Sequence, residues 1–588
     1  MRARSGTTRA TSAARSLSAT STARACTSTP SIRSDPPSRR ARTGAAPVPE
    51  PSEMTHDINR RRLLKALGTG AASGLLAPFG MAFGQAAPRN LLANPRFDRD
   101  PFQLGVASGE PAPDGFVLWT RLAPQPLEQG GGMVMRPMAV TWELAEDEGF
   151  RRVVRDGQAL ARPELAHAVH VEVEGLAPGR PYWYRFAVGG ATSPVGRSAT
   201  LPATDARVDR VRFAVAGCQH LEEGHFTAWR RIAEEPLDFV FHYGDYIYEG
   251  PDRGPGERML NGRPFMPLRR HVGGEIYSLD DYRRRYAQYR SDPDLQAAHA
   301  AVPWFVSFDD HEIDNNWAGE FDQDGTPPEL FMLRRAVAMQ AYYEHMPLRR
   351  RSMPHNGHMR MYRRAGWGDL LQAHFLDTRQ YRSDQVNGDR DGPQNDAVAD
   401  PSRTMLGAEQ EAWLYDGLRP DHHRWHAIAH QVSLANLAMR SRETGEVVHS
   451  MDQWSGYLGP RRRLLGHIHE AGMKNVVTVC GDAHRHFASD LLQDHEDSGV
   501  ISTEFLATSI SSGADGAGED DDFNRNARSL NPQLKAITDR RGYVLCEVTR
   551  DEWRGDLKVL DRVTVPDEPV RTYASFVVER GRPGLQPA

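Results

Sequence analysis

FVFHYGDYIYEG, residues 239–250, is the stretch that decides the fold. It starts as an uninterrupted apolar run, which is typical of a strand buried on both faces of an α/β sheet. The run gives way to Asp245, and Tyr248 follows three residues later. By itself this pattern also fits a common Gly-Asp turn followed by packing tyrosines. Its meaning therefore depends on what the rest of the chain places beside it.

Other apolar runs in the second half of the chain end in a similar way. Their last residues are Cys218 in VRFAVAGCQH, Asp309 and Asp310 in VPWFVSFDDHE, Asp377 in LLQAHFLDTRQYR, and Asp482 and His484 in NVVTVCGDAH. Helical stretches such as HFTAWRRIAEE alternate with these runs. Because ligands in α/β folds gather at the carboxyl ends of strands, the pattern predicts one shared site in an α/β domain over residues 206–588.

Residues 87–205 carry a different pattern. Short alternating runs such as MAVTWELAED and AHAVHVEVEGLAPGRPYWYRFAVGG are separated by Gly and Pro turns. Period-two alternation of this kind predicts an N-terminal antiparallel β-sandwich of about 100 residues, immunoglobulin- or fibronectin-like. The segment contains no obvious chemistry, so we expect the active groups to belong to the second domain.

Residues 1–53 are a low-complexity run of Arg, Ser, Thr, Ala and Pro, with too little apolar surface to fold. An export signal follows them, and such a signal has to start a chain. We therefore expect Met54 to be the initiator, with residues 1–53 left untranslated. The alternative is a genuine disordered leader.

Residues 54–86 have the form of that export signal: a charged start, a weakly apolar stretch and small residues near Ala86. The sequence NRRRLLK resembles the twin-arginine motif, with Arg60 and Arg61 as the pair. We expect the twin-arginine translocase to export the folded protein to the periplasm or the exterior. No later run reaches the roughly 20 apolar residues of a membrane span.

Composition narrows the class of function. The 588 residues include 72 Lys and Arg against 77 Asp and Glu, and the sequence pI is near 6.5. This balance lacks the basic field that nucleic-acid binding needs. The four cysteines are too few and too scattered for a disulfide framework. We expect Cys480 and Cys546, which lie within apolar runs, to be core residues, whereas Cys218 at a strand end is a candidate ligand.

A series of specific motifs covers nearly all of the chain after the signal. In order it includes FQLGVASGEPAPDGFVLWTRL, GCQ, GDYIYE, RRRYAQYRSDPDLQAAHAAVPWFVSFDDHE, AYYEHMPLR, LDTRQYR, LGAEQEAWL, MDQWSGYLGPRRRLL, GDAH and RRGYV. The series resembles the PhoD-type alkaline phosphatases, relatives of the purple acid phosphatases among the calcineurin-like metallophosphoesterases. The resemblance implies an α/β metallophosphoesterase domain with a central β-sandwich flanked by helices.

The resemblance also implies a two-metal site with one ferric ion, Fe³⁺, and calcium, Ca²⁺. Asp245 would bridge the metals. Tyr248 and Cys218 would bind Fe³⁺ as phenolate and thiolate, because anionic donors compensate its charge and metal binding drives their deprotonation.

Oxygen ligands suit the calcium ion. Asp310 is assigned to this second metal, with Asn315 or Asn316 as a helper. Asp482 and His484 would complete the site, and the motifs do not distinguish which metal each of them binds.

Further residues of the motifs have two readings each. His311 is either an outer-sphere catalytic group near the leaving oxygen or an orienting partner for a ligand. Arg379, with Asp377, either binds the substrate phosphate or forms a structural ion pair. Ser455 stands where the family pattern usually has Asp, which puts any polar contact there in doubt. The acidic segment 513–527 is either a calcium site or a mobile loop near the site entrance.

The function implied is direct hydrolysis of phosphate monoesters, and of diesters, by a metal-activated water for phosphate scavenging. One alternative is a phospholipase D or other dedicated phosphodiesterase acting on lipid or polymer phosphate esters, because the pocket walls rather than the metals choose the alcohol. The rival from another class is a non-catalytic exported binding protein.

Overall fold

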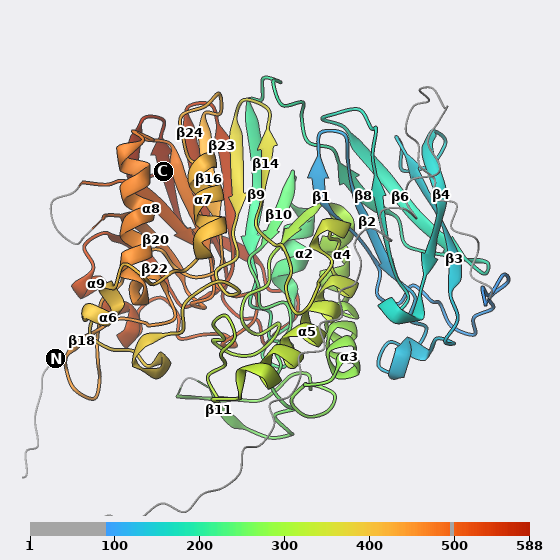
Figure 1. Ribbon diagram of the computed structural model, residues 1–588, viewed down its shortest axis with the longest axis horizontal. Coiled ribbons are helices and arrows are strands. Elements are labelled where there is room, and N and C mark those ends of the chain that lie inside the picture. Colours follow the sequence, from blue (N-terminus) through green and yellow to red (C-terminus); the bar gives the residue numbers. More distant parts are fainter. Residues whose placement is uncertain (1–89, 261, 494–498) are drawn as a thin grey trace, which may run out of the picture. The chain divides into compact units, whose positions relative to one another are not determined.

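The computed structural model describes residues 90–260, 262–493 and 499–588, which belong to one compact unit (Figure 1). The predicted leader (1–53) and export signal (54–86) lie outside the described residues, so they stay predictions. Within the described residues, no helix is both long enough and apolar enough to cross a membrane.

The N-terminal part is a β-sandwich. One sheet has the strand order β4-β3-β6-β7, with β8 paired to β6. Its strands are β3 (Met138–Ala145), β4 (Val153–Ala161), β6 (Pro181–Val188), β7 (Ala191–Thr192) and β8 (Gly196–Ala199). Strands β1 (Val106–Ala112), β2 (Gly115–Arg121) and β5 (Ala168–Val173) contribute to the same hydrophobic core. The predicted antiparallel N-terminal sheet domain is confirmed.

Strands β1, β2 and β5 also take part in a larger sheet. Strand β1 pairs in parallel with β13 (Trp304–Val306) through Gly109 and Trp304. The ten-stranded sheet therefore runs across the boundary predicted at residues 205 and 206, in the order β26-β25-β24-β23-β9-β10-β13-β1-β2-β5. Hydrogen bonds between distant strands produce this continuity, and local alternation does not encode them.

The second domain contains the rest of this sheet and a seven-stranded sheet of order β14-β15-β16-β19-β21-β20-β22. The remaining strands of the first are β9 (Arg210–Ala216), β10 (Phe239–His242), β23 (Arg541–Thr549), β24 (Glu552–Leu560), β25 (Val570–Glu579) and β26 (Arg582–Pro587). Those of the second are β14 (Arg363–Trp367), β15 (Leu371–Phe375), β16 (Trp425–Ala429), β19 (Val476–Cys480), β20 (His486–Leu491), β21 (Ser502–Leu506) and β22 (Leu534–Thr538).

The two sheets pack face to face. Side chains from both, among them Phe241 and Phe305 in the first sheet and Phe375 and Phe505 in the second, form one buried cluster. The rings of Phe305 and Phe375 stack with centroids 4.3 Å apart. The interior contains almost only apolar groups, as expected for a sandwich core. The expected central β-sandwich is therefore present.

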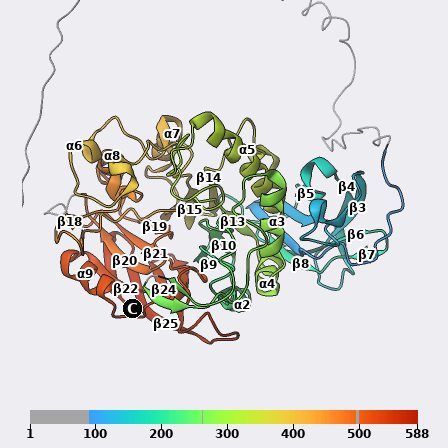
Figure 2. The ribbon, with the colours of Figure 1, turned by 90° about the horizontal axis from the view of Figure 1, so that it is seen from below.

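Helices cover the outer faces of both sheets (Figures 1 and 2). On the first sheet they are α2 (Thr227–Glu234), α3 (Leu279–Arg290), α4 (Pro293–Ala301) and α5 (Pro328–His345). On the second they are α7 (Gly407–Gly417) and α8 (Leu458–Glu470). Shorter elements are α6 (Asp396–Ala399), α9 (Asp522–Leu530) and two small hairpins, β11 (Arg258–Leu260) with β12 (Arg263–Phe265) and β17 (Met439–Arg440) with β18 (Val447–Val448).

The direction of the central strands positions the site. Strands β9, β10 and β13 run parallel to one another, and so do β15, β16, β19 and β21 in the other sheet. The segments that follow these parallel strands carry the predicted site residues. The sandwich therefore brings polar loops from two sheets to one place.

Candidate metal centre

Most of the predicted ligands lie in the short segments just after parallel strands. Cys218 follows β9, Asp245 follows β10, and Asp482 and His484 follow β19. All four have left-handed backbone conformations, with φ of 52°, 56°, 69° and 53°, respectively. Non-glycine residues rarely adopt this conformation, and such strain collects at functional sites because the surrounding structure enforces it. Each of these four ligands is therefore held on a constrained turn just after its strand.

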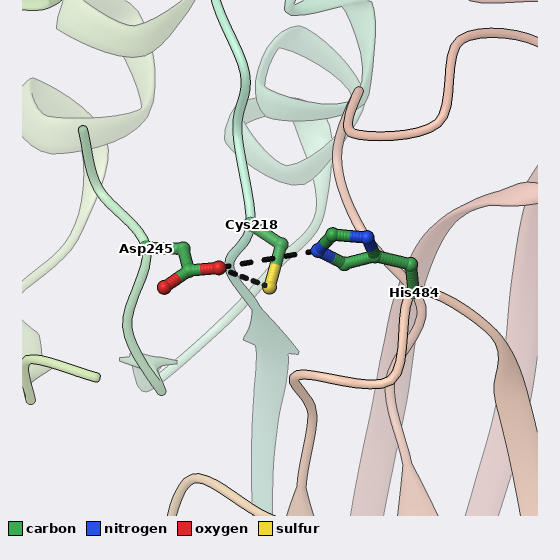
Figure 3. Close-up of side chains that lie close together, drawn as sticks. All are labelled: Cys218, Asp245 and His484. Carbon is green, nitrogen blue, oxygen red and sulfur yellow. Dashed lines mark hydrogen bonds and ion pairs between the residues drawn. The ribbon is translucent and has the colours of Figure 1, made fainter. Parts of the chain in front are cut away.

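One carboxylate oxygen of Asp245 joins the first group of ligands, because it interacts with both Cys218 and His484 (Figure 3). Its Oδ2 accepts a hydrogen bond from the Cys218 thiol at 3.2 Å and lies 3.9 Å from Nε2 of His484. The Tyr248 hydroxyl donates to the same oxygen at 2.9 Å and is 3.1 Å from His484 Nε2. One thiol, one phenol, one imidazole and one carboxylate thus converge, as the sequence predicted for three of them.

A second group shares Asp245. Ligand atoms of Asp245, Asp310 and His311 lie within 4.8 Å of one another, and the same holds for Asp309, Asp310 and Asp482. Asp245 and Asp310 thus connect the two groups. The geometry separates His484, which is on the Cys218 side, from Asp482, which is on the Asp310 side.

Asn316, rather than Asn315, adjoins the second group. The backbone N–H of Asn316 donates to Asp310 Oδ2 at 2.8 Å, and its side-chain amide donates to Asp389 at 2.6 Å. Asn315 donates its amide to Gln323 at 2.7 Å. The contact with Asp389 occupies the amide nitrogen of Asn316, so the amide oxygen is the atom left for a ligand.

Arg379 is the positive charge among the carboxylates. Its fully buried guanidinium bonds Asp309 through Nε and Asp452 through Nη1 at 2.8 Å. Nη2 lies 3.7 Å from Asp310 and 3.6 Å from Asp482. The ion pair with Asp377 that was one reading is not found: Asp377 accepts the backbone N–H of Arg379 instead. Arg379 therefore compensates the carboxylates of the site.

His311 is held by a carboxylate that the sequence left without a role. Glu249 accepts from Nδ1 of His311 at 2.7 Å and from the backbone N–H of Asn315. The imidazole ring also packs on Tyr248, with centroids 4.2 Å apart. Although burial opposes it, the charges of Glu249, Asp310 and Asp245 raise the pKa of His311 well above its usual value. The hydrogen bond to Glu249 and the contact with Tyr248 therefore hold the His311 ring beside the second group of ligands.

The donor set fits a cation. The second carboxylate oxygen of Asp245, Oδ1, is buried and has no hydrogen-bond partner among the described residues. Burial and the neighbouring carboxylates raise the pKa of the Cys218 thiol, and burial with the Asp245 charge raises that of Tyr248. Without a cation both groups keep their protons, and a metal reverses this balance because it favours the anionic form. Buried, mutually repelling anions beside one guanidinium indicate that positive charge belongs here.

A cavity of about 1010 Å³ opens beside His484. Apolar side chains from the β11–β12 hairpin and from α9, including Phe265, Met266 and Phe523, form part of its wall. Arg263 and Arg485 also line it. The predicted acidic segment 513–527 contributes much of the remaining wall, and its Asp515 already accepts from the backbone and side chain of Thr564. This segment therefore borders the approach to His484.

Several contributing residues were not predicted. Gln453 donates to Asp482, and Ser512 donates to the Tyr248 hydroxyl at 2.6 Å. Glu312 accepts from the backbone N–H groups of Asp245 and Asp309 at 3.1 and 2.8 Å. The acidic run DDHE gave a signal for Glu312, but no local pattern marks Gln453 or Ser512.

Ser455, the position that departs from the family pattern, is buried and donates to the carbonyl of Ser450 at 2.7 Å. Within the described part of the chain, the structure places no contact between Ser455 and a metal-group residue. Cys546 lies in the core between the sheets, as predicted.

Comparison with known proteins agrees with this geometry. Residues 213–557 match the description "PhoD-like phosphatase", and residues 85–202 match "PhoD-like phosphatase, N-terminal domain". The chain is 44% identical to alkaline phosphatase D of Bacillus subtilis (strain 168) over 540 residues, which are 91% of this chain and 90% of the relative. A solved structure titled "Structure of PhoD" superposes with a TM-score of 0.80 at 46% identity, covering 84% of this chain and 93% of the other. The family predicted from the motifs is confirmed, and the chain belongs to the PhoD-like phosphatases.

Proposed function

We propose that this protein is an exported alkaline phosphatase that hydrolyses phosphate monoesters, and diesters, at an Fe³⁺ and Ca²⁺ site in order to release phosphate. One observation carries the proposal: a buried carboxylate, Asp245, meets a thiol, a phenol and an imidazole on one side and a second carboxylate on the other. Membership of the PhoD-like phosphatases supports the reaction class.

In the proposal Cys218, Tyr248 and His484 hold the ferric ion, and Asp245 bridges to the second position. Three of these donors are anionic when deprotonated, which suits a trivalent ion. Asp310, Asp482 and the amide oxygen of Asn316 hold calcium, which prefers several oxygen ligands. All seven positions are those predicted from the motifs.

Bound together, two such cations supply a lowered pKa for a coordinated water and stabilise both the attacking and the leaving oxygen of an in-line displacement. In the proposal His311 protonates the leaving alcohol, and the hydrogen bond from its Nδ1 to Glu249, which orients the ring, supports this role. Arg379 keeps Asp309, Asp310 and Asp482 in position and is too deeply buried to reach far into the cavity. Its predicted role in phosphate binding is thereby replaced by a positioning role in the proposal.

The first experiment is the metal content and visible absorption of the purified protein, with hydrolysis of p-nitrophenyl phosphate followed with and without a calcium chelator. We expect near-stoichiometric iron, a visible phenolate-to-iron band that disappears in Tyr248→Phe, and turnover that depends on calcium. The matched control is Tyr246→Phe, because Tyr246 is equally buried but bonds His299 instead of the carboxylates. Colourless, iron-free protein with full activity would contradict the assignment of Cys218 and Tyr248.

A phosphodiesterase with a large alcohol group, including a phospholipase D, is the second candidate. The observation that favours it is the cavity of about 1010 Å³ beside His484, with its apolar wall. Rates on p-nitrophenyl phosphate, bis-p-nitrophenyl phosphate and phosphatidylcholine separate the two. Highest kcat/KM on phosphatidylcholine would make the lipid diesterase the correct function, and highest kcat/KM on the monoester would exclude it.

Export is part of the proposal. The motif NRRRLLK supports passage through the twin-arginine translocase to the periplasm or beyond. Replacing Arg60 and Arg61 with Lys is expected to leave activity inside the cell, measured by fractionation. Unchanged export of that variant would refute this route.

A further inference from the structure

Three ligand-type side chains meet in the sheet beneath the metal centre, and the proposed reaction uses none of them. They are His430, Cys480 and Glu504, whose ligand atoms lie within 4.8 Å of one another. Each is 0% exposed. They come from three neighbouring strands or strand ends, because His430 directly follows β16, Cys480 ends β19, and Glu504 lies within β21.

Strand register places the three on one face of the sheet. Thr478 is paired with Glu504, and Cys480 with Leu506, so Cys480 and Glu504 have the same parity. The backbone N–H of His430 donates to Val479, which brings its side chain beside Cys480. Residues of the opposite parity, such as Val479 and Phe505, belong to the core between the two sheets. The three side chains therefore occupy the helix-covered face, away from that core.

His430 is fully buried, and its ring can both donate and accept a hydrogen bond. Its ring nitrogens meet the geometry of a hydrogen bond with no described residue, although the backbone of Val432 is near enough to act on the pKa of the imidazole. An unmade hydrogen bond on a buried polar group is unfavourable, so such groups usually have a partner. His242 is also buried without hydrogen-bond partners among the described residues, but it packs against the rings of Trp229 and Trp304 and belongs to none of the ligand-type groups. At His430 the neighbours are a thiol and a carboxylate instead.

We propose that His430, Cys480 and Glu504 bind a zinc ion that is separate from the catalytic centre. Imidazole, thiolate and carboxylate are the three ligand types that Zn²⁺ takes in proteins. One thiolate and one carboxylate neutralise its two charges, so the complex can be buried without net charge. Burial lowers the pKa of His430 to about 3, which keeps the imidazole neutral as a ligand must be.

The carboxylate is already oriented for this role. Glu504 accepts from the Ser433 hydroxyl at 2.7 Å and from the backbone N–H of Leu434 at 2.6 Å. Such outer partners fix the direction of a ligating oxygen. The group Asp421, His422 and His423 differs in burial, because Asp421 and His422 are exposed to solvent.

The position of the zinc ion implies a structural role. Cys480 lies two residues before Asp482, and His430 precedes the segment that includes Ser433. A bond from the metal to all three strands would fix the bases of these segments. The ion would thus stabilise the scaffold of the catalytic centre without taking part in the reaction.

The test starts from full-length protein produced in zinc-supplemented medium and dialysed against a chelator. The chelator reaches the catalytic centre, where the His484 side chain is 34% exposed, but not the fully buried cluster. Zinc is then measured with a metallochromic dye as the protein is unfolded. We expect one zinc ion per chain to be released only on unfolding.

Variants assign the zinc to these residues. Cys480→Ala and His430→Gln are expected to lose the retained zinc, whereas Cys546→Ala, which removes an equally buried thiol from the core between the sheets, keeps it. Wild-type protein that releases no zinc on unfolding would overturn the proposal, and so would retention of zinc in folded Cys480→Ala. Because the wild-type release needs no variant, the proposal stays refutable if a substitution prevents folding.

Discussion

Replacing Arg379 with Met removes the positive charge around which the carboxylates of the site are arranged. The side chain is fully buried and pairs with Asp309 and Asp452, with Asp310 and Asp482 within 3.7 Å. Methionine fills a similar volume without charge. Breaking a buried pair by removing one partner costs about 3–5 kcal/mol, because the other charge stays buried and uncompensated. We expect Arg379→Met to lower the free energy of unfolding by that amount at neutral pH.

The loss should depend on pH in a defined direction. Burial raises the pKa values of Asp310 and Asp452, but the Arg379 charge, together with His311 beside Asp310 and Arg382 beside Asp452, outweighs it and keeps both below the usual range. A depressed pKa stabilises the folded state above the unfolded pKa, and this stabilisation is lost as pH falls through the folded pKa. Without Arg379 these carboxyls titrate higher in the folded state. The variant's deficit is therefore largest at neutral and alkaline pH and shrinks as pH falls, because the folded variant takes up protons at these carboxyls at a higher pH than the folded wild type does.

Urea unfolding of wild type and variant, followed by tryptophan fluorescence from about pH 8 to about pH 5, measures both quantities. The matched control is Arg335→Met. Arg335 is just as buried, but its guanidinium bonds the carbonyls of Gly357 and Gly319, with no carboxylate partner among the described residues. Its titratable neighbour is His358, whose Nδ1 lies 2.9 Å from Nη2 of Arg335, so its deficit should vary less with pH than that of Arg379→Met. A deficit below about 1 kcal/mol for Arg379→Met, or one that varies with pH no more than that of the control, would refute the reasoning.

Glu249→Gln should lower kcat by about 10–100-fold with metal content unchanged, because His311 loses the carboxylate that orients its ring and raises its pKa. Unaltered kcat on p-nitrophenyl phosphate would contradict this. Phe265→Ala removes apolar wall from the cavity and should raise KM for a bulky diester about tenfold, while KM for p-nitrophenyl phosphate stays constant; equal effects on both substrates would count against the cavity as the alcohol site. Gly481→Ala would put a Cβ 2.2 Å from the Tyr243 ring, so stability should fall by about 1–3 kcal/mol in thermal or urea unfolding, and wild-type stability would disprove the close contact.

The family, the two-part fold and the ligand types could be predicted from the sequence. Apolar runs such as residues 239–242 are local signals, and a strand that is buried on both faces needs little else to be recognised. Asp245, Cys218 and His484 follow such runs directly, so the chain order already placed them at the carboxyl ends of parallel strands. Their convergence in the structure follows from that order.

Other features depend on partners far away in the chain. Glu249 and His311 are 62 residues apart, and Ser512 and Tyr248 are 264 apart. The local sequence around a glutamate or a serine does not predict such a distant partner. For the same reason the sequence left two roles open for Arg379, substrate binding and a structural ion pair. Its contacts with Asp309 and Asp452 favour the ion pair.

The sequence by itself determined which chemical groups this protein brings to the ends of its strands, because strand burial and turn residues are properties of neighbouring positions. Only the tertiary structure decided which of these groups pair with an opposite charge, which are oriented by a hydrogen bond, and which meet in a buried cluster. Strand β1 pairing with β13 and the meeting of His430 with Cys480 and Glu504 are both of this kind. Register between distant strands fixes such contacts, and burial then sets their electrostatics, since the energy of a charge depends on everything that surrounds it.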